Sequence, residues 1–136
     1  MVLSVRDFPE FNQKMLRVAA LSGAAAVAMG AYGNHKVRNA SENKVHWEDF
    51  QTANKYHMNH SIMLAFAACI TKCALPSKLF LAGIVSFCLP KYHETITQKT
   101  TKFHEKSCPI GGSLLMLGWV SVAMLGLGCW KVKKCM

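Results

Sequence analysis

Acidic residues are scarce in this sequence, and long stretches have no charged residue at all. Seven Asp and Glu stand against sixteen Lys and Arg in a chain of 136 residues. Four segments contain none of these residue types: 18–33, 61–70, 79–89 and 110–130. A helix on the surface of a soluble protein shows a polar face along its whole length. These segments therefore exclude an ordinary soluble helical domain.

Signature motifs of the common enzyme classes are missing as well. The sequence has no nucleophile elbow, no phosphate-binding glycine loop and no dinucleotide-binding fingerprint. Its acidic residues all lie outside the uncharged segments, so no pair of carboxylates is placed inside a helix span. We expect neither an enzyme nor a cofactor site. No internal repeat or linker is visible either, which predicts a single domain over residues 1–136.

The sequence does contain enough apolar residues for four membrane spans, at about residues 15–33, 58–75, 78–96 and 109–130. The uncharged run 110–130 alone covers about 30 Å at ~1.5 Å per residue, which is one hydrocarbon thickness. The predicted fold is an all-α integral membrane four-helix bundle with short loops. Three spans is the alternative, because only eleven apolar residues precede Pro90. We expect the third helix to be short or kinked, with a polar extension that completes the crossing.

Proline and polar residues suggest where these helices begin and end. Leu75, Pro76 and Ser77 predict a tight turn between the second and third spans. The Thr- and Lys-rich residues 94–108 predict a solvated loop, and Pro109 is expected to start the fourth helix. The first span has an alternative interpretation as a cleaved secretory signal peptide, because basic residues precede it and small residues follow.

A stripe of small residues runs along the first span. Its members are Ala19, Gly23, Ala26, Gly30 and Gly33. Small residues let membrane helices approach closely where water supplies no driving force for association. We expect this face to pack against another helix.

Histidines and aromatic residues lie at helical spacing just before the second span. Steps of three and four residues place His46, Phe50, Ala53, His57, His60 and Leu64 on one stripe. His57 and His60 are one turn apart, and His35 follows the end of the first span. If the first two helices pack side by side, these three histidines become candidate metal ligands.

Two interpretations of these histidines stay open. In the first, His35, His57 and His60 form a proton or metal relay, completed by Glu48, Asp49 or His46. In the second, the imidazoles form hydrogen bonds at the membrane interface, where Trp47, Tyr56 and Tyr32 also belong. No H-E-x-x-H or comparable motif is present. We favour the structural interpretation and assign no metal.

The net charge of +9 invites a nucleic-acid hypothesis, but the distribution of charge argues against it. Lys and Arg flank the apolar segments instead of forming one basic stripe with aromatic residues. Anionic phospholipid headgroups are the simpler partner. With four spans, eight Lys and Arg fall on each side, so the orientation stays open.

Six cysteines are present, but they do not predict a disulfide framework. Cys69, Cys73, Cys88 and Cys129 lie in apolar spans, where a free cysteine behaves as a small hydrophobe. Only Cys108 and Cys135 are expected to be exposed. The C-terminal KKCM has the arrangement of a dilysine retrieval signal to the endoplasmic reticulum, but we favour the interpretation of these lysines as ordinary stop-transfer residues.

Several segments together resemble the transmembrane protein 256 family, which consists of small multi-pass proteins with relatives in bacterial inner membranes. The most specific segments are ANKYHMNHS and PIGGSLLMLGW, and the resemblance covers residues 17 to about 125. The resemblance implies a four-helix membrane fold without an assigned activity. Matching positions are Gly30, Gly33, His35, Ala53, Tyr56, His57, His60, Pro109, Gly111, Gly112, Gly118 and Trp119. Like the small residues of the first span, Gly111, Gly112 and Gly118 are expected to pack against other helices. The chain departs from the family after Phe87, which puts the third span in doubt.

These observations predict a structural or accessory component of a membrane complex, acting through contacts with itself or with other membrane proteins. The competing class is a small proton or metal transport or sensing protein. The family's bacterial relatives favour the mitochondrial inner membrane, and the dilysine tail favours the endoplasmic reticulum.

Overall fold

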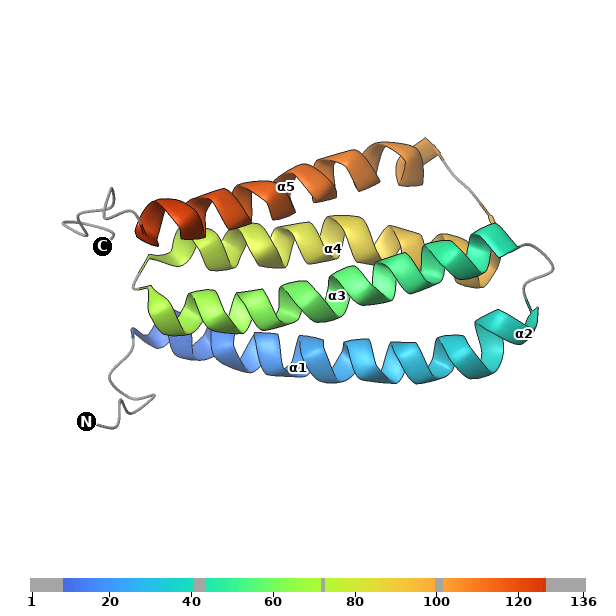
Figure 1. Cartoon of the computed structure of the whole chain (residues 1–136), viewed down its shortest axis with the longest axis horizontal. Coiled ribbons are helices and arrows are strands. Elements are labelled where there is room, and N and C mark those ends of the chain that lie inside the picture. The colour runs from blue at the N-terminus through green and yellow to red at the C-terminus, as the bar shows by residue number, and fades with distance from the viewer. Residues whose placement is uncertain (1–8, 41–43, 72, 100–101, 127–136) are drawn as a thin grey trace.

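The chain forms four long helices that lie side by side in the part that the structure describes (Figure 1). The structure is a computed structural model that describes residues 9–40, 44–71, 73–99 and 102–126. The long helices are α1 (Glu10–Tyr32), α3 (Lys44–Ile70), α4 (Ala74–Thr97) and α5 (Lys102–Gly126). A π-helical turn, η2 (Gly33–Val37), and the short α2 (Arg38–Ala40) continue α1. These residues contain no strand, so the all-α prediction is confirmed.

The long helices follow one another in chain order, each beside the next (Figure 1). α3 packs against α1 on one side and α4 on the other, and α5 packs against α4. Buried side chains between the helices form one core that includes Phe50, Leu64, Phe80, Ile84 and Leu115. The position of α3 between two neighbours matters for the site, because its polar side chains can reach partners on both.

Three helical segments within the described residues are long and apolar enough to cross a membrane. They are Glu10–Val37, Ala74–Thr97 and Lys106–Met124, with mean hydropathies of 1.4, 1.3 and 1.5. α4, which contains the span that we doubted, is among them. α3, which contains the predicted second span, is not, because Asn54, His57 and His60 interrupt its apolar sequence. The expectation about which span is weakest was therefore wrong.

The boundary between α3 and α4 also differs from the prediction. Leu75, Pro76 and Ser77 lie in the first turn of α4 instead of forming a turn between helices. Proline is tolerated there because the first N–H groups of a helix have no partner within it. α3 ends at Ile70 and α4 begins at Ala74, and between them the Cys73 amide donates to Thr71 Oγ1 at 2.9 Å. The predicted span 58–75 thus joined the end of one helix to the start of the next.

α4 continues through Pro90 for two further turns, as the polar extension required. A contact with α3 stabilises those turns, since the Lys91 ammonium lies 3.0 Å from Asp49 Oδ2 on α3. The Thr95 hydroxyl donates to the Lys91 carbonyl at 2.9 Å, which satisfies a carbonyl near the helix end. The contacts with α3 therefore support the polar extension of α4, which makes it a 24-residue helix.

The predicted loop 94–108 and the predicted start of the last helix were wrong. α4 ends at Thr97 and α5 begins at Lys102, so Pro109 lies inside α5. A proline inside a membrane helix removes one backbone hydrogen bond, and packing against neighbouring helices compensates for it. Of the cysteines, Cys73 and Cys88 are buried, whereas Cys69 is exposed and Cys108 is half-buried. Residues 127–130 of the last span, Cys129, Cys135 and the KKCM tail lie outside the described residues.

Candidate functional site

Polar side chains gather on the middle of α3, between α1 and α4. Asn54, His57 and Ser61 follow one another at steps of three and four residues, which places them on one face of the helix. His60 lies next to this face and reaches toward α5 instead. These residues are the candidate functional site, because they include both histidines that are buried in the described part of the chain.

His57 joins three helices through its two ring nitrogens. Nε2 lies 3.0 Å from the Ser22 hydroxyl of α1, and Nδ1 lies 3.3 Å from the Tyr92 hydroxyl of α4. The Ser22 hydroxyl is also 2.7 Å from the Ser61 hydroxyl, which donates to the His57 carbonyl at 2.8 Å. The His57 residue is only 7% exposed. Both nitrogens are therefore occupied by protein partners.

Asn54 completes this hydrogen-bonded chain. Its side-chain amide donates to the Ala26 carbonyl of α1 at 2.7 Å and to the Tyr92 hydroxyl at 3.1 Å. Tyr92 thus lies between Asn54 and His57 and bridges α4 to two residues of α3. Polar side chains of membrane helices stabilise association by bonds of this kind, since lipid offers no partner.

His60 occupies a separate, aromatic environment. Its Nδ1 lies 2.8 Å from the Tyr56 carbonyl, which can only accept, so Nδ1 carries the proton. Nε2 then accepts from the Trp119 indole N–H of α5 at 3.2 Å. The rings of Tyr56, Phe80 and Trp119 lie 5.5, 6.0 and 6.3 Å from the imidazole centroid. This geometry describes a neutral imidazole that links α3 to α5.

The structure does not bring the three predicted histidines together. His35 is exposed on η2, and its carbonyl accepts from the Asn39 side chain at 3.1 Å. Of the suggested further ligands, Asp49 pairs with Lys91, Glu48 is exposed and the His46 Nδ1 is buried without a partner. Within the described ranges, no group of three or more His, Cys, Asp or Glu is placed to hold a metal ion.

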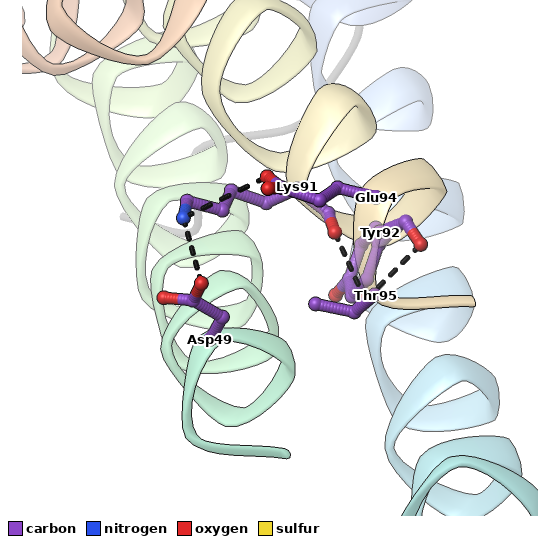
Figure 2. A network of polar contacts seen from close by, with 5 residues as sticks. All are labelled: Asp49, Lys91, Tyr92, Glu94 and Thr95. Atoms are coloured by element: carbon purple, nitrogen blue, oxygen red, sulfur yellow. Dashed lines mark hydrogen bonds and ion pairs between the residues drawn. The ribbon is translucent and has the colours of Figure 1, made fainter. Parts of the chain in front are cut away.

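A charged cluster lies at the polar end of α4, close to Tyr92 (Figure 2). The Lys91 ammonium lies 3.0 Å from Asp49 Oδ2 and 3.9 Å from Glu94 Oε2. The three side chains are 21%, 34% and 12% exposed, so water screens them only in part. The Thr95 hydroxyl donates to the carbonyls of Lys91 and Tyr92 at 2.9 and 3.1 Å. The cluster therefore fixes the α4 turn that carries Tyr92.

The small residues of α1 face α3. Ala19 and Ala26 are 2% and 1% exposed, and an ideal Cβ on Gly23 would lie 4.0 Å from Ser61 Cβ. A Cβ on Gly30 would lie 3.0 Å from Asn54 Oδ1, and one on Gly33 would lie 2.0 Å from Phe50 Cε1. Contact with α3 is therefore closest where α1 ends and η2 begins, at Gly30 and Gly33.

The small residues of α5 differ among themselves. A Cβ on Gly111 would lie 2.6 Å from the Phe87 nitrogen, and one on Gly118 would lie 2.8 Å from Phe80 Cε1. Gly112 meets no atom within 4 Å, so the expected helix contact is absent there in the described part of the chain. Gly111 and Gly118 are seven residues apart and share one helix face, whereas Gly112 is turned about 100° away.

Sequence reasoning missed several residues that connect the helices. Asn12, 2% exposed, donates to the Ala68 carbonyl at 3.0 Å and also to the Thr71 carbonyl. Gly83 admits Leu115, since a Cβ there would lie 2.5 Å from Leu115 Cδ2. Asn54 and Tyr92 were not singled out either. For Asn12, Asn54 and Tyr92, the signal available in the sequence was a polar residue within or beside an apolar segment.

The candidate site lies within the part of the chain that resembles known proteins. Residues 29–112 match a family model described as "Protein of unknown function (DUF423)". The chain is 33% identical over 118 residues to a UPF0382 membrane protein of Haemophilus influenzae. The aligned residues make up 82% of this chain and 92% of that protein. No solved structure matches. Asn54, His57, His60 and Tyr92 all lie within the residues that match the family model.

Proposed function

The chain belongs to the DUF423 family of proteins of unknown function, and we propose that it is a non-enzymatic structural or accessory component of a membrane complex. The observation that carries this proposal is the use of the two buried histidines. His57 and His60 each have both ring nitrogens hydrogen-bonded to groups of the protein. Side chains used in this way hold helices in fixed positions and have no nitrogen left for a substrate.

The proposal includes a membrane crossing by α3 together with the three apolar helices. Asn54, His57 and Ser61 point at partners on α1 and α4, and His60 points at α5. Their bonds offset the cost of placing polar groups in hydrocarbon. Four crossings put both ends of the described chain on the same side of the membrane.

The outward faces of the end helices support a role in contacts with lipid or protein. Leu21 and Val27 on α1 are 72% and 62% exposed, and Met116 on α5 is 64% exposed. Further exposed apolar residues on α5 are Ile110, Leu117, Trp119, Val120 and Met124. So much exposed apolar surface is typical of a face that contacts lipid or another protein. Acyl chains cover part of it, and a partner protein or second copy of the chain covers the remainder.

Two finer assignments belong to the same proposal. Within the membrane family, the segments ANKYHMNHS and PIGGSLLMLGW support a place beside the transmembrane protein 256 proteins. The bacterial membrane relative supports the mitochondrial inner membrane as the location, whereas a functional dilysine tail would place the protein in the endoplasmic reticulum. Imaging of a tagged chain beside organelle markers separates the two locations.

The complex is tested by native electrophoresis after extraction of the tagged chain in a mild detergent. We expect the protein to migrate in an assembly larger than one chain. Leu21→Trp and Met116→Trp then probe the outer faces of α1 and α5, because an added ring is tolerated against lipid but disturbs a protein interface. Each substitution serves as the control for the other, because the one that leaves the migration unchanged marks a face covered by lipid. Migration of the parent as a single chain would contradict the proposal.

A second function is favoured by the continuity of the hydrogen bonds around His57. Ser61, Ser22, His57 and Tyr92 form an unbroken chain across three helices, which is the arrangement of a proton relay. This relay differs from the one that the sequence predicted, because it contains His57 but neither His35 nor His60. Reconstitution with a pH-sensitive dye in liposomes tests it. Proton flux that disappears in His57→Gln would favour the relay over the structural role.

A further inference from the structure

A cleft with both apolar and polar walls lies between the C-terminal end of α1 and the first half of α3. Its volume is about 370 Å³, within the range of roughly 300 to 1,000 Å³ that is usual for sites of small ligands. Its walls are Gly30, Asn34, Trp47, Phe50, Gln51, Asn54 and Lys55. Only Asn54 belongs to the hydrogen-bonded chain around His57, so most of this cleft has no part in the function proposed above.

The lining offers hydrogen-bond donors and one positive charge, but no carboxylate. Asn34 donates to the Gly30 carbonyl at 3.2 Å, and Asn54 is occupied by Ala26 and Tyr92. Gln51 and Lys55 make no hydrogen bond or ion pair within the described residues. The nearby Asp49 is paired with Lys91. An ammonium and an amide without partners in one cleft are complementary to an anion.

The cleft lies where lipid headgroups are expected. Tyr92 bonds Asn54, and this contact places Lys55 at the same level as Lys91, where the apolar part of α4 ends. On α1, the uncharged segment 18–33 ends beside the cleft. Trp47 has an apolar ring and a polar N–H, a combination that favours the boundary between hydrocarbon and water.

The backbone beside the cleft contains a π-helical turn, which is an observation separate from the charge of the lining. α1 changes to a π-helical turn at Gly33, and Asn34 in this turn lines the cleft. Phe50, another wall residue, packs directly onto Gly33, where no side chain would fit. Single π-helical turns occur often at functional sites, because they redirect side chains at the cost of regular hydrogen bonding.

We propose that this cleft binds the phosphate of an anionic phospholipid headgroup. Lys55 supplies the charge and Gln51 supplies an amide donor. Trp47 lies farther than Lys55 from the apolar half of α3 and packs against the part of the headgroup beyond the phosphate. The inference rests on the membrane location in the proposed function but does not require a protein complex. It gives the Lys and Arg beside the apolar segments one specific lipid contact in place of a diffuse attraction.

The test uses the purified full chain in dodecyl maltoside, titrated with dioleoyl phosphatidylglycerol. Bound lipid is counted by native mass spectrometry, and the thermal midpoint is measured in parallel. We expect Lys55→Gln to weaken binding about fivefold, the effect of one lysine at an anionic surface. Lys106→Gln is the matched control, because it removes the same charge from an exposed residue near the start of α5 that does not line the cleft. It should bind as the parent does.

Each other result has a definite meaning. Equal weakening in Lys55→Gln and Lys106→Gln would overturn the site in favour of general electrostatics. Equal binding of dioleoyl phosphatidylcholine would overturn the requirement for an anionic lipid. The same thermal shift with inorganic phosphate would overturn the lipid assignment and leave a free anion as the ligand. None of these results bears on the native assembly, so failure here is distinct from failure of the proposed function.

Discussion

Gly33 and Phe50 approach so closely that no larger residue fits at position 33. An ideal Cβ on Gly33 would lie 2.0 Å from Phe50 Cε1, well inside the contact distance of two carbon atoms. Phe50 is 1% exposed and also contacts the rings of Trp47 and Tyr92 at centroid distances of 6.1 and 5.2 Å. The ring therefore has little freedom to move away.

Gly33→Ala should lower the free energy of unfolding by about 1 to 3 kcal/mol, the usual cost of overpacking a core. Gly112→Ala is the matched control, because nothing lies within 4 Å of a Cβ there. Alanine is the better helix former by about 1 kcal/mol, so this control should be neutral or slightly stabilising. Thermal unfolding in detergent measures both variants. Equal midpoints for the two would contradict the close contact.

Tyr92→Phe tests the hydrogen-bonded chain around His57. The change removes the hydroxyl that accepts from Asn54 and bonds His57, and it keeps the ring beside Phe50. We expect a loss of about 1 kcal/mol in the free energy of unfolding. Tyr56→Phe is the control, because the Tyr56 hydroxyl makes no hydrogen bond within the described residues. If both changes have the same effect, the hydroxyl of Tyr92 does not join the helices.

Asp49→Asn tests the ion pair between α3 and α4. We expect the free energy of unfolding to fall by about 1 kcal/mol, because the pair is only partly screened by water. High salt should reduce the difference between the variant and the parent. Glu10→Gln breaks the Glu10 and Lys14 pair, which is 2.6 Å long but open to solvent, and should have no measurable effect. A larger effect of Glu10→Gln would reverse the expected order.

Carbonate washing at high pH tests insertion into the membrane. The uncharged residues 110–130 and the apolar faces of α1 and α5 should keep the protein in the membrane pellet. Release into the supernatant would contradict an integral protein. Tags at the two ends test the crossing of α3, since an even number of crossings leaves both tags on one side. Protease accessibility of only one tag in sealed vesicles would mean an odd number.

The sequence predicts the helical class and the small-residue face of α1 well, because both depend on local periodicity. Ala19 and Ala26 are seven residues apart, and both are buried as a helix contact requires. Proline was a poorer guide. Pro76 was interpreted as part of a turn and Pro109 as a helix start, but Pro76 lies in the first turn of α4 and Pro109 lies inside α5. Whether a helix passes through a proline depends on packing against its neighbours, which local sequence does not contain.

The candidate site could be predicted only in part for the same reason. The spacing of His57 and His60 places them near each other, but it does not reveal that one reaches Tyr92 and the other Trp119. Asn54 and Tyr92 are 38 residues apart, and their contact exists only after α4 extends beyond Pro90. The ion pair of Lys91 and Asp49, next to Tyr92 on the same turn of α4, is also a contact between distant segments.

The low hydropathy of α3 has a consequence for how the chain is made. As it leaves the ribosome, α3 presents Asn54, His57 and His60 without the partners that they have in the folded protein. Each such group is costly in hydrocarbon, so α3 is a poor candidate for insertion alone. Ser22 has been synthesised by then, but Tyr92 and Trp119 come later. If α3 crosses the bilayer, it therefore enters together with α4. When translation stops before Tyr92, α3 should stay outside the bilayer.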